Sequence, residues 1–206
     1  LVIDDGSTDQ SLEIASRFKD QRIRILENES NLGIPTTQNR ALAEARGSYF
    51  AILDQDDIAT PNRLSAQASF LDCETDVAAV GAFYQGIDQQ GNPKGPVKKR
   101  PTRPSELACQ LLFQSALHQP AVMLRTTILR GFGYRTRYPI CADYDLWTRL
   151  SQHHLLANLP EVLAYYRQGE HQTTKRASQR LANDTMAIQG DLLRRLGIEP
   201  SEQDLV

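Results

Sequence analysis

Residues 49–61 read Tyr-Phe-Ala-Ile-Leu-Asp-Gln-Asp-Asp-Ile-Ala-Thr-Pro, and this stretch decides the fold class. Residues 49–53 are a continuous apolar run with the length of a buried strand. Thr60 and Pro61 form a helix start, in which a capping residue precedes proline at the first helical position. An acidic segment, residues 54–57, separates the two. The stretch therefore predicts a buried strand, an acidic loop and a helix in direct succession.

The same alternation of apolar runs and helical patterns continues on both sides of this stretch. Further strands are expected at 1–3, 23–25, 77–83, 121–124 and 162–166, a hairpin or long loop at 86–104, and helices after Gln10 and over roughly 36–46, 105–113, 143–151 and 176–196. Ser7 and Gln10 form a capping box for the first of these helices, whose apolar face includes Phe18. Strands separated by helices predict an α/β fold with a Rossmann-like, mostly parallel central sheet flanked by helices.

The composition is that of one globular domain. The chain has 206 residues, of which 40% are hydrophobic and 23% are charged, and domains commonly hold about 100–200 residues. The formal net charge of −2 gives no basic footprint, so nucleic acid is not expected as a partner.

Cysteine usage and hydropathy predict the compartment. Cys73, Cys109 and Cys141 are widely spaced and form no CxxC pair, so we expect small buried thiols in a reducing compartment instead of disulfides or a zinc site. No apolar run approaches the ~20 residues that cross a bilayer, and no signal peptide is visible. A cytoplasmic protein is expected, and association with the inner face of a membrane stays open.

The first residues have the pattern of a strand end. Leu1-Val2-Ile3 is followed at once by Asp4-Asp5, as though the chain were leaving a buried strand. We therefore expect position 1 to be a cut, with the first strand and the first helix of the fold missing. In that case the strand edge beside this segment would be exposed, which is an aggregation hazard.

The acidic loop predicts a cation site. Residues two apart in an extended chain point the same way, so Asp54 and Asp56 present their carboxylates on one side, ~7 Å apart. Such oxygen ligands suit Mg²⁺ or Mn²⁺, with water and substrate phosphate oxygens completing the coordination. Ligands of α/β sheets bind beyond the carboxyl ends of the strands, where this loop is expected. A solvated acidic turn is the alternative, and the flanking strand and helix favour the site.

Two other acidic clusters stand at expected element ends. Asp4 and Asp5 follow an apolar run, and a carboxylate there can accept hydrogen bonds from a nucleobase or ribose. Capping of the next helix is the alternative role for this cluster. Asp143 begins a helix that packs through Trp147, and the partial positive charge of a helix N-terminus keeps a carboxylate ionised. Taken alone, Asp143 would be expected only to cap its helix.

Other motifs fit the sequence less well. An EF-hand loop in this position needs Gly at 59 and Glu at 65, and the chain has Ala59 and Ser65. A phosphatase of the haloacid dehalogenase type would want Thr or Val where Ile58 stands, which keeps that class as a weak competitor. Gly131-x-Gly133 lacks the third glycine of a dinucleotide fingerprint, and no P-loop is present.

Six segments stand in one order over nearly the whole chain. They are Asp4-Asp5-Gly6-Ser7-Thr8-Asp9, Asn31-Leu32-Gly33, Gly47-Ser48-Tyr49-Phe50, Leu53-Asp54-Gln55-Asp56-Asp57, Asp143-Tyr144-Asp145-Leu146-Trp147 and Tyr166-Arg167. In that order and spacing they resemble the family 2 inverting glycosyltransferases with the GT-A fold. The resemblance implies metal-dependent, inverting transfer of a single sugar from a nucleoside-diphosphate-sugar to an acceptor hydroxyl, by a hexosyltransferase-type enzyme of bacterial surface polysaccharide or glycoconjugate synthesis.

The resemblance also implies residue roles. Asp54 and Asp56 match the DxD pair that holds the metal, Mg²⁺ or Mn²⁺, and the donor diphosphate, and Asp57 supports that turn. His171 is a further candidate metal ligand, with a surface-loop histidine as the alternative. Asp143 matches the catalytic base that removes the acceptor hydroxyl proton. Nucleotide contacts are expected from Asp4, Asp5, Gly33, Asn39, Asp54 and Asp56.

The sequence departs from the family pattern at several positions. Ala142 stands where many members have Glu before the catalytic Asp, so a supporting carboxylate is absent. Gln38 precedes Asn39 where many members carry Arg, which affects the expected phosphate contacts. Trp147 is the only tryptophan and no QxxRW motif is present, so a processive polysaccharide synthase is not expected.

One GT-A-like domain is expected over residues 1–206. Its nucleotide-sugar-binding part covers 1–85, its acceptor and catalytic part 86–175, and a C-terminal helix 176–196. The expected acceptor is a glycan, a lipid-linked molecule or a protein. Two alternatives stay open: a non-catalytic nucleotide-sugar-binding module and a sugar nucleotidyltransferase. The donor base, the sugar and the acceptor depend on pocket side chains that the motifs do not specify.

Overall fold

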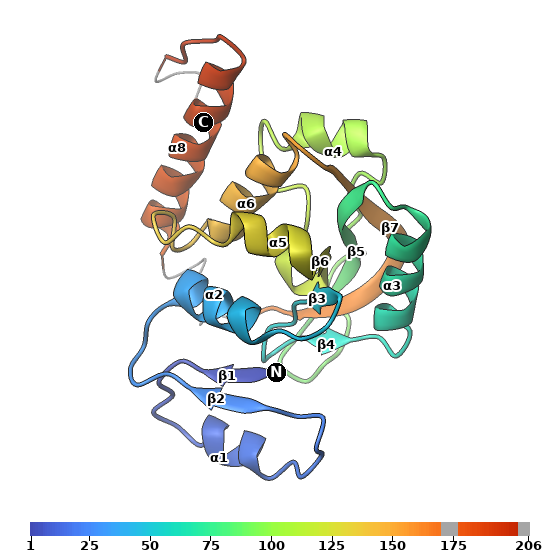
Figure 1. Ribbon diagram of the computed structural model, residues 1–206, viewed down its shortest axis with the longest axis vertical. Helices are drawn as coiled ribbons and strands as arrows, with labels where there is room; N and C mark the ends of the chain where they lie inside the picture. Colours follow the sequence, from blue (N-terminus) through green and yellow to red (C-terminus); the bar gives the residue numbers. More distant parts are fainter. Residues whose placement is uncertain (170–176, 202–206) are drawn as a thin grey trace.

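The computed structural model describes residues 1–169 and 177–201. Its central sheet has five strands in the order β3-β6-β5-β7-β4. These strands are β3 (Tyr49–Ala51), β4 (Ile58–Ala59), β5 (Val77–Ile87), β6 (Met123–Arg125) and β7 (Leu155–Arg167). The helices are α1 (Ser11–Ser16), α2 (Ile34–Glu44), α3 (Arg63–Cys73), α4 (Pro104–Gln110), α5 (Thr126–Phe132), α6 (Ala142–Leu150) and α8 (Ser178–Arg195), with a 3₁₀ turn at Gln119–Ala121. Helix α3 covers one face of the sheet, and α5 and α6, with α2 and α8 beyond them, cover the other (Figure 1).

The expected α/β class is confirmed, but the sheet is mixed and not mostly parallel. Only β5 and β7 pair in parallel in the central sheet, whereas β6 runs antiparallel to both β3 and β5, and β4 runs antiparallel to β7. The prediction treated each helix as a crossover between parallel neighbours. Apolar periodicity indicates that a segment is a strand and carries no information on its direction.

The β5–β7 pair is the longest strand pairing of the sheet. Its register runs from Val77 opposite Leu155 to Ile87 opposite Arg167, with bulges near Phe83. Strand β5 is buried along most of its length because helices cover both faces. Both strands extend well beyond the predicted ranges. The hairpin expected after β5 is present, with bridges that join Tyr84 to Lys98 and Ile87 to Pro93.

Two expected features around β4 are corrected. Helix α3 begins at Arg63, later than the predicted start at Thr60-Pro61. The backbone N–H of Thr60 donates to the carbonyl of Leu163 at 3.0 Å, so this residue continues the pairing of β4 with β7. Strand β4 is two residues long, too short for sequence periodicity to reveal.

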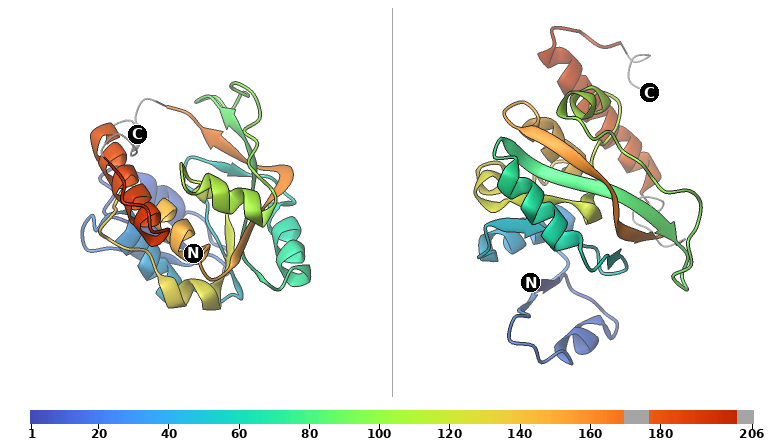
Figure 2. Two further views of the ribbon diagram at one scale, coloured as in Figure 1. Left: turned by 90° about the horizontal axis from the view of Figure 1, so that it is seen from above. Right: turned by 90° about the vertical axis from the view of Figure 1, so that its right-hand side faces the viewer.

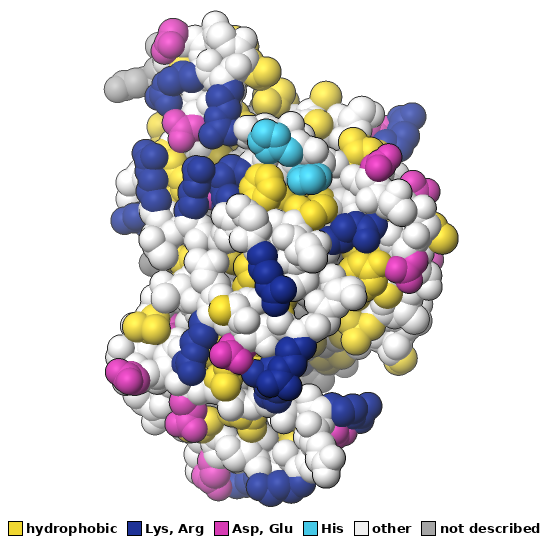
Figure 3. Space-filling view, in the orientation of Figure 1, with side chains coloured by type: hydrophobic (Ala, Val, Ile, Leu, Met, Phe, Trp, Pro, Cys, Tyr) yellow, Lys and Arg dark blue, Asp and Glu magenta, His cyan; other side chains and the backbone are white. Residues whose placement is uncertain are grey.

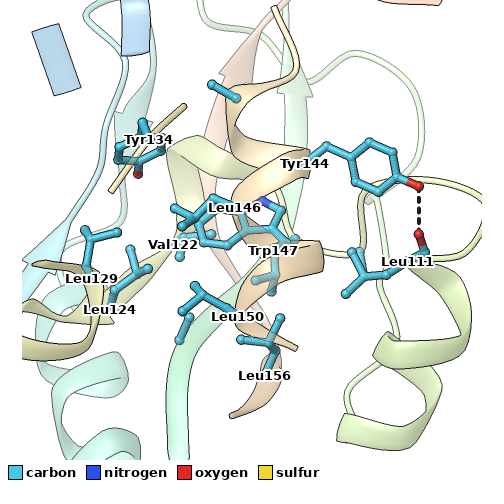
Figure 4. Close-up of a cluster of buried hydrophobic side chains, with 14 of the residues drawn as sticks. Leu111, Val122, Leu124, Leu129, Tyr134, Tyr144, Leu146, Trp147, Leu150 and Leu156 are labelled. Carbon is cyan, nitrogen blue, oxygen red and sulfur yellow. Dashed lines mark hydrogen bonds between the residues drawn. The ribbon is translucent and has the colours of Figure 1, made fainter. Parts of the chain in front are cut away.

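Helix α6 carries the centre of the core. Leu146, Trp147 and Leu150 are each fully buried (Figure 4). The Tyr144 hydroxyl donates a 2.7 Å hydrogen bond to the carbonyl of Leu111, which ties α6 to the end of α4. These contacts fix the orientation of α6, and with it the position of Asp143 in its first turn.

The first 33 residues form a small unit with no buried apolar side chain. Strands β1 (Val2–Asp4) and β2 (Ile25–Glu27) make a separate two-stranded parallel sheet, and α1 lies beside it (Figure 2). Helix α1 ends before Phe18, which is 64% exposed, so the expected apolar face is not formed. The predicted capping box is also wrong, because Asp9 and not Ser7 accepts the N–H of Ser11, at 2.9 Å.

All three cysteines are free thiols, and only one has the expected burial. Cys141 is buried beneath α8, whereas Cys73 and Cys109 are exposed at the end of α3 and on the outside of α4. Among the described residues, no helix has both the length and the apolar character needed to span a bilayer.

Two glycines offer a matched test of the packing. A Cβ on Gly81, in β5, would clash with the side-chain amide oxygen of Asn158 and lie 2.9 Å from Leu117 Cδ2. Asn158 cannot move away, because its Nδ2 donates to the carbonyls of Pro101 and Ala116. We predict that Gly81→Ala lowers the free energy of unfolding by about 1–3 kcal/mol, measured by urea denaturation.

The control is Gly131 in α5, where an added Cβ meets nothing within 4 Å. Gly131→Ala should stabilise the protein by up to about 1 kcal/mol, since alanine has the higher helix propensity. Equal effects of the two substitutions would contradict the close approach at Gly81.

Candidate active site

A cavity of about 570 Å³ opens where α2, the loop after β3, the start of α6 and the end of β7 meet. Its polar lining includes Gln38, Asp54, Asp56, Gln119, Asp143 and Arg167. Two of the acidic clusters singled out in the sequence, separated by more than eighty residues, therefore line one cavity.

The acidic loop is anchored to the end of β7. The Asp57 carboxylate accepts the backbone N–H of Arg167 at 2.9 Å, and the Arg167 Nε donates to the Asp56 carbonyl at 2.8 Å. The N–H of Asp57 donates to the Asp54 carbonyl at 3.1 Å, which closes the turn. Asp57 therefore braces the loop, and Asp54 and Asp56 are left to face the cavity.

The loop concentrates negative charge. Burial, together with the nearby Asp56 carboxylate, raises the pKa of Asp54 to about 6. Burial raises the pKa of Asp57 to about 7, with contributions from Asp54 and Asp56, against the hydrogen bond from Arg167. A cation bound at the cavity surface would relieve this repulsion.

The two carboxylates that face the cavity fit a divalent cation. Mg²⁺ and similar ions are commonly held by one or two protein carboxylates and completed by water and substrate phosphates. Within residues 1–169 and 177–201, no group of three His, Cys, Asp or Glu side chains converges as a complete metal cage. A cation held by these two carboxylates would therefore have coordination positions left for water or a bound ligand.

Asp143 reaches the same cavity from the first turn of α6. Burial raises its pKa to about 6, opposed by hydrogen bonds from the backbone N–H groups of Tyr144 and Asp143 itself, and the charge of Asp54 raises it further. The carboxylate is therefore mostly ionised at neutral pH yet basic enough to accept a proton. Those are the properties of a general base.

The four other predicted nucleotide-binding residues do not line this cavity. Asp5 accepts the backbone N–H groups of Leu32 and Gly33, each at 2.9 Å, and the Asn28 side chain, and these hydrogen bonds lower its pKa despite the opposing effect of burial. Asp4 accepts the N–H of Ser7 at 3.1 Å. The turn directly after it engages Asp4, and the segment that leads into α2 engages Asp5.

Gly33 and Asn39 contribute structure around α2. Gly33 has φ +83°, a left-handed conformation that favours glycine, directly before the helix. The Asn39 side chain exchanges two 2.8 Å hydrogen bonds with the backbone of Tyr134, which ties α2 to the segment after α5. His171, the third predicted metal ligand, lies outside the described residues.

Two glutamines in the cavity were not predicted as site residues. Gln38 is on α2 and Gln119 is in the 3₁₀ turn, and the amide oxygen of each is buried without a hydrogen-bond partner among the described residues. Gln38 stood out only as a departure from a family pattern. A single glutamine carries no sequence signal that distinguishes a pocket residue from a surface one.

The family model described as "Glycosyl transferase family 2" matches residues 1–130. This chain therefore belongs to glycosyltransferase family 2.

Particular relatives extend the similarity beyond the matched region. An uncharacterized glycosyltransferase from Haemophilus influenzae is 31% identical over 185 residues, 84% of this chain and 57% of the relative. TarS from Staphylococcus aureus, a poly(ribitol-phosphate) beta-N-acetylglucosaminyltransferase, is 26% identical over 217 residues, covering all of this chain and 37% of TarS. The chain spans little more than half the length of the first of these relatives.

Two solved structures share the fold. TarS 1-349 in complex with UDP-GlcNAc has a TM-score of 0.69 at 20% identity, covering 98% of this chain and 58% of that chain. The mannosyltransferase PcManGT from Pyrobaculum calidifontis, in complex with GDP-Man and Mn²⁺, has a TM-score of 0.62 at 17% identity, covering 94% and 54%. At these identities the likeness establishes the glycosyltransferase fold alone.

The raised pKa of Asp57 predicts that removing its charge stabilises the protein, by an amount that depends on pH. Its folded pKa, about 7, lies above the ordinary value of 3.8, so ionisation of Asp57 opposes folding increasingly as pH rises through that window. Asp57→Asn keeps the acceptor for the Arg167 N–H and removes the charge. At about pH 8 we expect a gain on the order of 1 kcal/mol, or roughly 2–4 °C in Tm, without added metal.

The gain should shrink to a small fraction at about pH 4, because the stability lost through the raised pKa of Asp57 accrues almost entirely between the unfolded-state value of 3.8 and the folded-state value of about 7. Thermal denaturation at the two pH values measures it, and Asp76→Asn, at an exposed position in the chain, is the control. An equal shift at both pH values would contradict a strained buried charge at Asp57.

Proposed function

We propose that this chain is an inverting glycosyltransferase that moves one sugar from a nucleoside-diphosphate-sugar to an acceptor hydroxyl. The observation that carries the proposal is the meeting of Asp54, Asp56 and Asp143 in one cavity, in a chain of this family. The cavity has the size of a small-molecule site.

The donor diphosphate lies against the acidic loop in this proposal. Asp54 and Asp56 would hold Mg²⁺ or Mn²⁺, which when bound offsets the negative charge of the diphosphate and of the leaving nucleotide. The electrostatic repulsion between the two carboxylates and the raised pKa of Asp54 support a cation at this position. The complex of PcManGT with GDP-Man and Mn²⁺ supports the same combination of ligands.

Asp143 is the proposed base. It accepts the proton of the acceptor hydroxyl while that oxygen attacks the anomeric carbon from the face opposite the diphosphate. The new glycosidic C–O bond forms as the bond to the diphosphate oxygen breaks, so the anomeric configuration inverts. Gln38 and Gln119, beside these carboxylates, would orient the bound sugar through their amide groups.

The remaining residues that were predicted to bind the nucleotide would act indirectly, by fixing backbone segments beside the cavity. Asp5 fixes the turn at Leu32 and Gly33, and that turn leads directly into α2, whose Ile34 and Gln38 line the cavity. Asp4 and Asn39 brace the neighbouring segments in the same way. His171 stays a proposed metal ligand from sequence alone.

The acceptor is proposed to belong to a bacterial surface polysaccharide or glycoconjugate. The name of TarS, a poly(ribitol-phosphate) beta-N-acetylglucosaminyltransferase, supports a cell-envelope polymer. A glycan, a lipid-linked molecule and a protein all present the hydroxyl that the reaction needs. Peripheral association with a membrane would follow from a lipid-linked acceptor.

Two substitutions separate chemistry from binding. Asp143→Asn should lower kcat for sugar transfer by roughly 10²–10⁴-fold while leaving donor affinity little changed, because it removes the base and keeps the shape. Asp54→Asn should weaken metal-dependent donor binding. Transfer from UDP-, GDP- and dTDP-sugars would be measured by chromatography, and the product anomer assigned by NMR.

Asp76→Asn, at an exposed position outside the cavity, is the matched control. A retained anomeric configuration would overturn the single-displacement mechanism. Donor binding with neither transfer nor donor hydrolysis would favour the alternative, a non-catalytic nucleotide-sugar-binding module. Release of diphosphate from a nucleoside triphosphate and a sugar phosphate would indicate a nucleotidyltransferase.

A further inference from the structure

A second polar cavity, of about 270 Å³, lies at the opposite end of α6 from Asp143. It is lined by Gly131, Phe132, Arg135, Arg149, Gln152, His153 and Arg195. Asp143 and Arg149 are six residues apart on α6, about 9 Å along the helix axis. None of these lining residues belongs to the first cavity, so this is a separate site.

Arg149 lies at the base of this cavity, where its side chain is held in place. Its side chain is 8% exposed, its Nε lies 2.8 Å from an oxygen of the Asp145 carboxylate, and its other nitrogens donate to the carbonyls of Phe132 and Gly133 at 3.1 and 2.7 Å. Arg135 approaches the same carboxylate from outside, at 3.6 Å. One buried carboxylate thus serves two guanidinium groups.

Arg195 adds a third positive charge. It is the last residue of α8, it is exposed, and its guanidinium forms no hydrogen bond or ion pair with the described residues. The neighbouring carboxylate on α8, Asp191, is already paired with Arg194 at 2.9 Å. Burial lowers the pKa of Arg149, the charge and hydrogen bond of Asp145 oppose this, and the charges of Arg135 and Arg195 lower it further. Among the described residues, the cavity lining holds three arginines and no acidic side chain.

The surface around this cavity has the same sign. Lys and Arg side chains gather over α8 and the adjoining end of α6, with histidines beside them (Figure 3). Three arginines line one concave surface, and the one carboxylate paired with them, Asp145, is shared by Arg149 and Arg135 only. This arrangement is poor for stability and good for binding an anion. Guanidinium groups donate paired N–H groups that match the oxygens of phosphate.

We propose that this cavity binds a phosphate group, separately from the nucleotide-sugar. Arg135 and Arg195 are placed to donate hydrogen bonds to the phosphate oxygens, and Arg149 supplies a fixed positive charge beneath them. Gln152 and His153 are the further polar side chains at the rim. A free phosphate and the phosphomonoester headgroup of a lipid share this chemistry, and both would fit the exposed arginines.

Equilibrium dialysis against radiolabelled inorganic phosphate tests the proposal, at neutral pH and constant ionic strength with EDTA. EDTA removes divalent cations, so the acidic first cavity repels phosphate and does not contribute. The test variant carries Arg135→Gln and Arg195→Gln, two exposed positions whose loss leaves the Arg149–Asp145 pair intact. The matched control carries Arg17→Gln and Arg22→Gln, which are exposed in the first 33 residues.

Wild type and control should bind phosphate with the same Kd, and the test variant should bind it at least about tenfold more weakly, since the loss of even one charge-assisted hydrogen bond weakens binding by about that factor. Circular dichroism of the variants confirms that each is folded. Equal binding by wild type and test variant, or no saturable binding by wild type, overturns the proposal.

Vesicle flotation distinguishes the two sources of the phosphate group. Vesicles of phosphatidylcholine with phosphatidic acid are compared with vesicles of the same charge made with phosphatidylserine, which lacks a phosphomonoester. Retention of wild type and control, but not of the test variant, on phosphatidic acid vesicles alone identifies the lipid headgroup as a ligand. Phosphate binding without vesicle retention identifies a soluble phosphorylated ligand.

Discussion

The crowding of carboxylates at the end of β3 is the constraint on which the rest of the site depends. Asp54, Asp56 and Asp57 lie in one loop, two of them with raised pKa values, and a loop with this charge would be expected to move out into solvent. The chain prevents this by fastening the loop to β7 through Arg167. Arg63, fully buried on α3, donates to the carbonyls of Ile52 and Val122 at the base of the loop. Burial lowers the pKa of Arg63 to about 10, and the charge of Asp57 opposes this. The carboxylates of Asp54 and Asp56 still repel each other, and both line the cavity.

The position of Asp143 follows from packing and not from local hydrogen bonds to the loop. The apolar side of α6, centred on Trp147, is buried against the sheet, and burying a side chain of this kind stabilises the fold by roughly 1.5–3 kcal/mol or more. Turning the helix to move Asp143 away from the cavity would expose that side chain. The same helix ends beside the three arginines, so one rigid element bears a negatively charged and a positively charged site at its two ends.

The parts of this architecture that depend on local pattern could be predicted from the sequence. The apolar run before Asp54, the acidic loop and the helix with Asp143 in its first turn all follow from periodicity and residue chemistry, and the structure places them as expected. The direction of β6 could not be predicted, because an antiparallel insertion has the same alternation as a parallel strand. The engagement of Asp5 and Asn39 by backbone groups was also inaccessible, since those partners lie 27 or more residues away in the chain. The basic cavity was invisible for the same reason, because α5, α6 and α8 each supply part of it and no single segment is basic.

The most direct test of a cation-dependent nucleotide site between the acidic loop and α6 is a calorimetric titration of UDP, GDP and dTDP into the purified protein, with and without Mn²⁺. Binding of one nucleotide that requires Mn²⁺ is the predicted result, because the diphosphate cannot approach Asp54 and Asp56 without a compensating charge. Failure to bind any of the three nucleotides with Mn²⁺, or binding that is equally tight in EDTA, would contradict this arrangement of the site.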